Sequence, residues 1–96
     1  MEYIYKSAGT YFGFIANGFL YSRDGAYLGW LEGLHVWDAD GRYRGQHWNG
    51  KYIISNRFGV LPVPRPPRAV PAVPALPNPP PNIQAIVLPT GWVDAF

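Results

Sequence analysis

The side chains that could carry out metal-assisted or acid–base chemistry are few in this chain. His35 and His47 are its only histidines, and it has no cysteine. A three-ligand zinc site, or a metal-dependent enzyme at a subunit interface, would need both histidines to converge with a carboxylate such as Asp38. His35 stands at a position of a repeat, described below, that is otherwise Tyr3 and Phe19, which indicates a packed ring. The sequence therefore predicts no metal site and no cofactor.

Other motifs resemble chemical sites but fit turns better. The segment 38–41 (Asp-Ala-Asp-Gly) opens like a calcium loop, yet Arg42 stands at the third ligand position and Asn49 at the twelfth, where an EF-hand has glutamate. The serines fall in turn positions, and no Gly-x-Ser-x-Gly elbow is present. The glycines have the spacing of hairpin turns, with no following helix whose N-terminus could hold phosphate. We therefore expect no catalytic residues and no enzyme activity.

The aromatic side chains offer a different kind of site. Trp30, Trp37 and Trp48, together with His35, could stack sugars or nucleobases, so an aromatic-lined module for glycans or nucleic acid is an alternative function. The net charge is only +2. Six cations follow Asp40 before the next acidic residue, but they are dispersed and match no nucleic-acid motif, so nucleic acid is not the expected partner. These cations are Arg42, Arg44, Lys51, Arg57, Arg65 and Arg68.

Composition divides the chain into parts. Residues 1–61 hold 10 of the 11 glycines and 14 of the 16 aromatic residues but no proline, whereas residues 62–81 hold 10 of the 11 prolines. We therefore expect a folded domain of residues 1–61, a polyproline II arm of residues 62–82 and a C-terminal strand or docking segment of residues 83–96. A core of about sixty residues without disulfides is marginal alone, so we expect a homo-oligomer, with a tetramer favoured.

The same composition carries an expectation about location. No apolar run approaches the roughly 20 residues of a membrane span. The first residues, Met1-Glu2-Tyr3, lack the basic and apolar regions of an export signal. The sequence therefore predicts a cytoplasmic protein without a membrane partner.

A unit of about 16 residues recurs four times in the first part of the chain. The copies align as residues 5–13, 21–29, 37–45 and, in degraded form, 53–61. The turn column reads Ala-Gly, Asp-Gly, Asp-Gly and Asn-Arg, and the column two positions later is tyrosine in three copies. A glycine column follows, which predicts a ring lying across the backbone, a bulge or a close approach of strands.

Turn signals of two kinds set the strand lengths. Asp-Gly between apolar runs predicts a hairpin with a type I′ turn, and a second series of turns lies between the copies at 17–18, 32–33 and 49–50. Such spacing leaves room for short strands and for no helix of useful length. We therefore predict an all-β fold: a meander of about eight short antiparallel strands, two per repeat, followed by the proline-rich arm.

The alternation of side chains predicts that both faces of this sheet are apolar. Ile4, Leu20 and Val36 share one face, and the aromatic residues beside them lie on the other. In the second strand of the first copy, Phe12 and Phe14 are expected on one face. A sheet with two apolar faces must curl, stack or pair with another chain.

The arm carries a recognition pattern. Arg68, Pro71 and Pro74 have the three-residue spacing and flanking cation that polyproline-reading domains select, with Arg65 just before them. A plain linker or surface-wrapping arm is the main interpretation, and a ligand for a polyproline-reading protein is the alternative.

The residues after the arm form an apolar run. Residues 83–88, with Ile83, Ile86 and Leu88, predict an extra strand, and Trp92 and Phe96 follow it. A stiff spacer of about 20 residues would carry this segment to a neighbouring subunit as a strand-exchanging arm.

The segment 28–41, Leu-Gly-Trp-Leu-Glu-Gly-Leu-His-Val-Trp-Asp-Ala-Asp-Gly, resembles the LGWF-x-x-G-x-x-x-D-x-x-G core of the four-fold beta-flower domain family of small, uncharacterised bacterial proteins. The resemblance extends over most of residues 18–61 and to the layout, a proline- and arginine-rich tail that ends near Trp92 and Phe96. Leu31 departs from the usual phenylalanine. The resemblance implies an all-β fold with four-fold character, from four repeats or from four subunits, and it brings no known activity.

Taken together, these patterns predict a non-enzymatic, self-assembling β module whose proline-rich arm contacts another subunit or a partner.

Overall fold

The computed structural model describes residues 1–59, 62–72 and 74–96, and these residues form a single antiparallel sheet. Its eight strands are neighbours in chain order, and the described residues form no helix, hence none that could span a membrane. The all-β prediction is confirmed. The strands are β1 (Glu2–Tyr5), β2 (Tyr11–Ala16), β3 (Phe19–Ser22), β4 (Tyr27–Glu32), β5 (His35–Asp38), β6 (Tyr43–Trp48), β7 (Tyr52–Asn56) and β8 (Trp92–Asp94).

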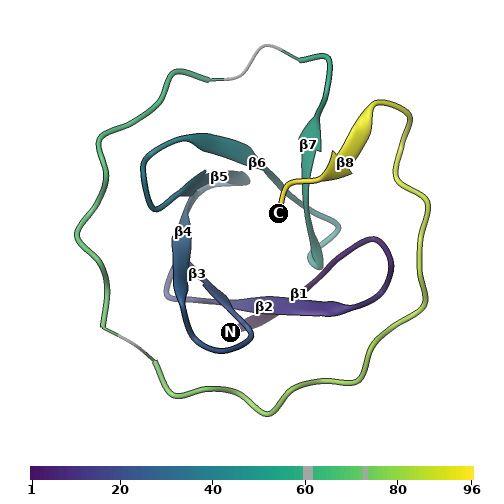
Figure 1. Ribbon diagram of the computed structural model, residues 1–96, viewed down its shortest axis with the longest axis horizontal. Coiled ribbons are helices and arrows are strands. Elements are labelled where there is room, and N and C mark those ends of the chain that lie inside the picture. The colour runs from purple at the N-terminus through teal and green to yellow at the C-terminus, as the bar shows by residue number, and fades with distance from the viewer. Residues whose placement is uncertain (60–61, 73) are drawn as a thin grey trace.

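The sheet curls into a flat disc of 36 × 35 × 18 Å. Four strand pairs, which we call petals, stand around a common centre: β1–β2, β3–β4, β5–β6 and β7–β8 (Figure 1). The segment between β7 and β8 runs around the outside of the petals as a ring, and we call its described part, within residues 62–91, the belt. All four petals therefore come from one chain.

The turns within the first three petals share one geometry. Gly9, Gly25 and Gly41 have positive φ, and each donates its N–H to the carbonyl three residues earlier. The two central turn residues keep negative φ, which matches a type I turn followed by a left-handed glycine rather than the type I′ turn expected from Asp-Gly. Two consecutive positive φ values occur instead between petals, as at Asn17 and Gly18.

Each of these petals also contains a β-bulge at an equivalent position. The register between the two strands shifts so that Phe12, Leu28 and Arg44 have no partner across the ladder. A bulge reverses the alternation of side chains along a strand. Phe12 therefore packs against the inner core, whereas Phe14 stacks on Tyr21 at 5.3 Å. The expectation that Phe12 and Phe14 share a face was wrong for this reason.

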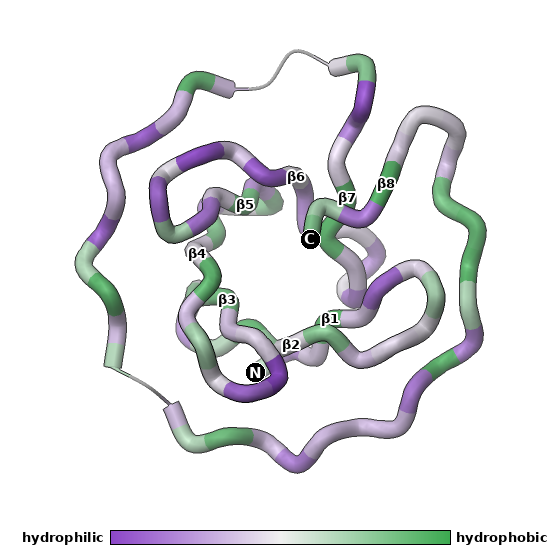
Figure 2. Tube along the Cα trace, viewed as in Figure 1, coloured by the Kyte–Doolittle hydropathy of each residue, from purple (hydrophilic) through white to green (hydrophobic). Residues whose placement is uncertain are grey.

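The inner face of the sheet holds an aliphatic core. Ile4, Leu20 and Val36, predicted as one column, are almost fully buried there together with Ile15 and Ile53. The outer face is largely aromatic and lies beneath the belt, whose apolar stretch around residues 83–88 is the green part on the right of the ring in Figure 2. Both faces are thus covered within one chain.

The fourth petal differs from the sequence prediction. Its core residue is Ile53, one place later than the aligned Tyr52, because the connection before β7 contains Lys51 in addition to an Asn-Gly turn. Its second strand does not follow directly: β7 pairs with β8, more than thirty residues later. Residues 60–61, the end of the aligned fourth copy, lie outside the described residues.

The C-terminal segment also departs from expectation. Residues 83–88 form no strand, and the strand is residues 92–94 instead. This strand pairs with β7.

Hydrogen bonds between petals hold the ring together. The backbone N–H groups of Arg23 and Ala39 donate to the carbonyls of the bulge residues Phe12 and Leu28. Ser7 stands at the equivalent place where the last petal meets the first. Its N–H and hydroxyl donate to the two carboxylate oxygens of Asp94, at 2.9 and 2.7 Å. A side chain of β8 therefore closes the ring.

We predict that closure depends on this carboxylate. Replacing Asp94 by alanine should lower the free energy of unfolding by about 2 kcal/mol, because two hydrogen bonds to a charged acceptor are lost. Urea unfolding measures the change. Asp24→Ala, in an exposed turn, is the matched control. Equal losses in the two variants would show that the Ser7–Asp94 contact does not contribute.

The glycine column gives a second prediction. A Cβ on Gly29 would lie 1.9 Å from the carbonyl oxygen of Trp37, whereas one on Gly33 would meet no atom within 4 Å. Gly29→Ala should therefore cost about 3 kcal/mol of stability, since backbone has to move. Gly33→Ala should cost only about 1 kcal/mol, the strain of its positive φ. Thermal unfolding compares the two, and a smaller loss at Gly29 would contradict a close strand approach there.

Candidate functional site

The outer face of the sheet presents pairs of stacked aromatic rings. Phe14 stacks on Tyr21 in the β2–β3 pair, and Trp30 stacks on Trp37 in the β4–β5 pair, 6.3 Å apart and nearly parallel. Within each pair the two rings face each other, because the two residues are register partners in an antiparallel ladder. Trp30 is fully buried and Trp37 is 3% exposed, although both belong to the face that lacks the aliphatic core.

The belt covers this face with one row of side chains, in which every third residue is turned toward the sheet. Between residues 71 and 86, every third described residue is half-buried and most of those between are exposed. Three residues per turn is the period of polyproline II, so one row of side chains faces the sheet throughout. The half-buried row is Pro71, Pro74, Pro77, Pro80, Ile83 and Ile86.

Backbone hydrogen bonds fasten the belt at the petal turns. Arg65 donates to the carbonyl of Gly41 at 2.7 Å, and Ile83 donates to that of Gly9 at 2.9 Å. A Cβ on either glycine would lie under 2 Å from a carbonyl oxygen of the belt. The glycines of the turns therefore serve a second purpose, since only a bare Cα lets the belt backbone come this close.

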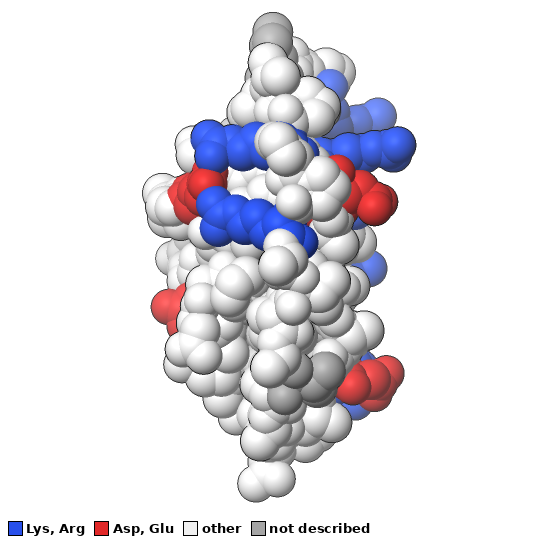
Figure 3. All heavy atoms as spheres, turned by 90° about the vertical axis from the view of Figure 1, so that its left-hand side faces the viewer, with Lys and Arg blue, Asp and Glu red and all other residues white. Residues whose placement is uncertain are grey.

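Two arginines of the belt lie in a clamp formed by Trp30, Trp37 and Glu32. The Arg65 guanidinium lies over the Trp37 ring at 4.4 Å, and that of Arg68 lies over Trp30 at 4.9 Å. The carboxylate of Glu32 pairs with both arginines. In the upper half of the rim seen in Figure 3, long basic side chains lie flat beside acidic ones. The clamp combines cation–π contacts with charge-assisted hydrogen bonds.

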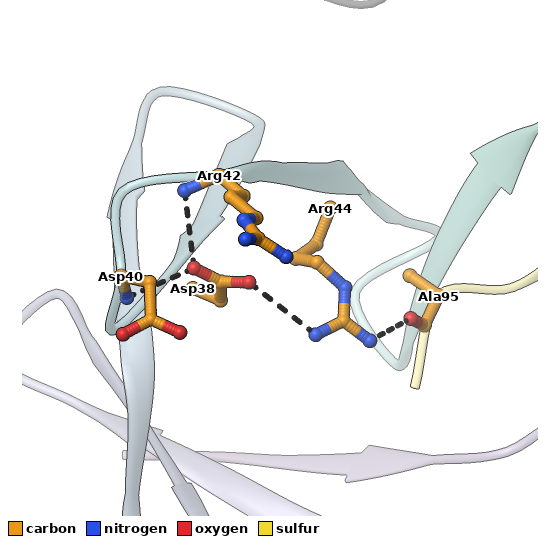
Figure 4. A network of polar contacts seen from close by, with 5 residues as sticks. All are labelled: Asp38, Asp40, Arg42, Arg44 and Ala95. Carbon is orange, nitrogen blue, oxygen red and sulfur yellow. Dashed lines mark hydrogen bonds and ion pairs between the residues drawn. The ribbon is translucent and has the colours of Figure 1, made fainter. Parts of the chain in front are cut away.

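A second arginine network holds the C-terminal residues over the centre of the disc. Arg44, a bulge residue, donates to the carbonyl of Ala95 at 2.6 Å and pairs with Asp38 at 3.6 Å (Figure 4). Its guanidinium also lies 4.1 Å from the centre of the Phe96 ring. The other oxygen of Asp38 accepts the backbone N–H groups of Asp40 and Arg42. The interpretation of segment 38–41 as a turn is therefore confirmed.

The two histidines do not meet. His35 is exposed, and its Nδ1 lies 2.9 Å from the hydroxyl of Tyr43, whereas His47 faces Glu2 at 3.6 Å. No three histidine or carboxylate side chains among the described residues come close enough to hold a metal. The converging set of His35, Asp38 and His47 that a metal-dependent enzyme would need is not formed there.

Two hollows lie where the belt begins beside β5 and β6. The first, about 240 Å³, is lined by His35, Tyr43, Gly45, Gln46, Asn56, Gly59, Pro62 and Trp92. The second, about 670 Å³, is lined by Asp38, Arg42, Tyr43, Arg44, Pro62, Val63 and Pro64.

The aromatic residues that the sequence offered as a stacking surface lie at different places in the structure. Trp30 and Trp37 lie together under the belt, and Trp48 packs against Tyr52. His35 is exposed, with its ring edge-on against Trp37 at 5.9 Å. The four residues proposed to stack sugars or nucleobases therefore do not form one open surface. Trp30 and Trp37 are covered by the belt.

The predicted arm and docking residues lie on the sheet of the same chain. Arg65 and Arg68 occupy the clamp, and Pro71 and Pro74 belong to the half-buried row. The side chains that would enter a partner's groove are thus turned to the chain's own face. Ile83, Ile86, Leu88 and Trp92 pack into the outer cluster, and Phe96 packs into the inner one.

Glu32 is the functional residue that sequence reasoning missed. It lies beside a turn, and nothing in the 16-residue repeat distinguishes it. The available signal was in the arm, where two arginines three residues apart on a polyproline II helix indicate a nearby acceptor for their N–H groups. Glu32 is the only acidic residue of β4.

Burial under the belt leads to a prediction about tyrosines. Burial raises the pKa of Tyr11, Tyr21, Tyr27 and Tyr43 above the ordinary 10.0, although Arg68 works against the rise at Tyr27. The stability that these neutral phenols contribute is present below pH 10 and is lost as the pH rises through their folded-state values. Tyrosinate absorbance of the folded chain should therefore appear at higher pH than in urea. Coincident curves would contradict this.

Comparison with known proteins agrees with this architecture. No curated protein and no solved structure matches the chain. The family model described as "4-fold beta flower protein" matches residues 1–94, which includes the belt and β8 as well as the repeats. With its repeats, its four petals and the closing strand all inside that match, the chain belongs to the 4-fold beta flower protein family.

Proposed function

We propose that this chain is a non-enzymatic assembling module and that copies associate by exchanging their belts. The interaction elements are then the outer aromatic face and the proline-rich belt that covers it. The observation that supports this most is that the belt and β8 complete a petal whose other strand, β7, lies more than thirty residues earlier.

Exchange needs no new interface. If the belt and β8 of one copy lie on the face of another, every contact of the closed chain is kept and only the connection changes. The contacts that would transfer are the clamp at Glu32, the backbone bonds at Gly41 and Gly9, and the Ser7–Asp94 contact. Because the alternative contacts are identical, the balance between monomer and oligomer depends on concentration and on the connecting segment.

The size of the assembly follows from the same geometry. Four-fold character comes from four petals of one chain, so it does not require four subunits. Reciprocal exchange between two copies is the simplest closed product, and the tetramer favoured by the sequence stays a prediction. A polyproline-reading protein as a partner would have to compete with the face that already holds Arg68, Pro71 and Pro74.

Belt exchange predicts mixed assemblies. When unlabelled chain and chain labelled with heavy isotopes are incubated together at high concentration, native mass spectrometry should show oligomers that contain both. Mixing should be faster in Glu32→Gln, because the clamp no longer holds the belt, than in the matched control Asp40→Asn. Light scattering on the same samples gives the subunit number. A chain that stays monomeric at every concentration, or oligomers that never mix, would contradict the proposal.

A further inference from the structure

The clamp has the properties of a recognition site and not only of an internal contact. Trp30 and Glu32 lie on β4 and Trp37 lies on β5, so all three side chains belong to the sheet and none to the belt. The two indoles stack 6.3 Å apart, and one carboxylate lies within reach of both guanidinium groups above them. Each arginine therefore has its own ring, and both share one acid.

This arrangement favours two arginines that are three residues apart on a polyproline II helix. Residues three apart lie on the same side of a polyproline II helix, about 9 Å apart along its axis. Arg65 and Arg68 fit that spacing, with one guanidinium over each ring at 4.4 and 4.9 Å. A shift of either arginine by one residue would turn its side chain a third of a turn away from the sheet. A lysine would keep the charge but could not lie flat or donate in a fork.

The belt is held here in a way that leaves it open to displacement. Residues 62–70 are all exposed, and the side chains of Arg65 and Arg68 are 49% and 44% exposed. Beneath them, the indole N–H groups of Trp30 and Trp37 are buried without a hydrogen-bond partner among the described residues. Polyproline carbonyls are natural acceptors for such donors, which is the chemistry of a surface that binds polyproline strands.

We propose that Trp30, Trp37 and Glu32 form a site that binds, in trans, polyproline strands carrying arginines three residues apart, and that the chain's own belt is its displaceable first occupant. This deepens the proposed function, on which it rests: the occupant in an assembly is the Arg-x-x-Arg stretch of a second copy. One copy then recognises the belt of another through this site.

A labelled synthetic peptide with the sequence of residues 62–72 tests the site directly. It is titrated onto the full chain carrying Arg65→Ala and Arg68→Ala, which vacates the clamp, with fluorescence anisotropy as the readout. Saturable binding is expected, and the unchanged chain should bind roughly tenfold more weakly because its own arginines compete. If circular dichroism shows that the double variant is unfolded, the chain carrying Arg65→Ala alone replaces it in the titration.

Two controls decide whether the site reads the pattern. Adding Glu32→Gln to the vacated chain, or moving the second arginine of the peptide by one residue, should each weaken binding by roughly tenfold. Asp40→Asn should leave it unchanged. Binding that survives both changes, or no binding to the vacated chain, would overturn the inference. If the peptide binds as expected but isotope-labelled copies never mix, only the proposed function fails; if copies mix and the peptide does not bind, only the inference fails.

Discussion

The structure depends on one constraint: a single small sheet has two apolar faces, and a chain of 96 residues has to cover both. Curling buries one face, because aliphatic side chains from all four petals meet at the centre. Curling cannot bury the other, which becomes the outside of the ring. A second layer of strands would need partners for its own backbone. The belt avoids that need, since polyproline II lacks internal hydrogen bonds and proline has no N–H to satisfy.

The curled sheet and the belt run around the same centre, so contact points on the belt have to lie beside the matching points on the sheet. The belt meets equivalent places of the ring at Gly41 through Arg65 and at Gly9 through Ile83. Thirty-two residues of sheet, two repeats, therefore correspond to eighteen residues of belt. The bulge residue Arg44 holds the segment that follows β8, through a hydrogen bond to the carbonyl of Ala95. Local irregularities thus connect the sheet to the segment that closes it.

Much of the ring could be predicted from sequence because its determinants are local and repeated. The glycine turns and the column of Ile4, Leu20 and Val36 follow from a period of 16. So does the absence of helix in the part of the chain that the structure describes. The misses have physical reasons. A bulge reverses side-chain alternation without changing composition, which misplaced Phe12. One extra residue, Lys51, shifts a copy by one place. The partner of β7 lies far along the chain, where periodicity carries no information. Glu32 acquires its role only from what lies above it.

The three-residue row of the belt restricts how the length of this segment can vary. Between the clamp and Ile86 the belt keeps one side toward the sheet, from charged to proline to aliphatic residues. One inserted residue would rotate everything after it by a third of a turn and bring Asn82 and Ala85 to the places where Ile83 and Ile86 now pack. Three inserted residues would keep the phase but lengthen the path by about 9 Å. Tolerated length changes should therefore be paired with a wider ring, which makes belt length a gauge of the circumference it encloses.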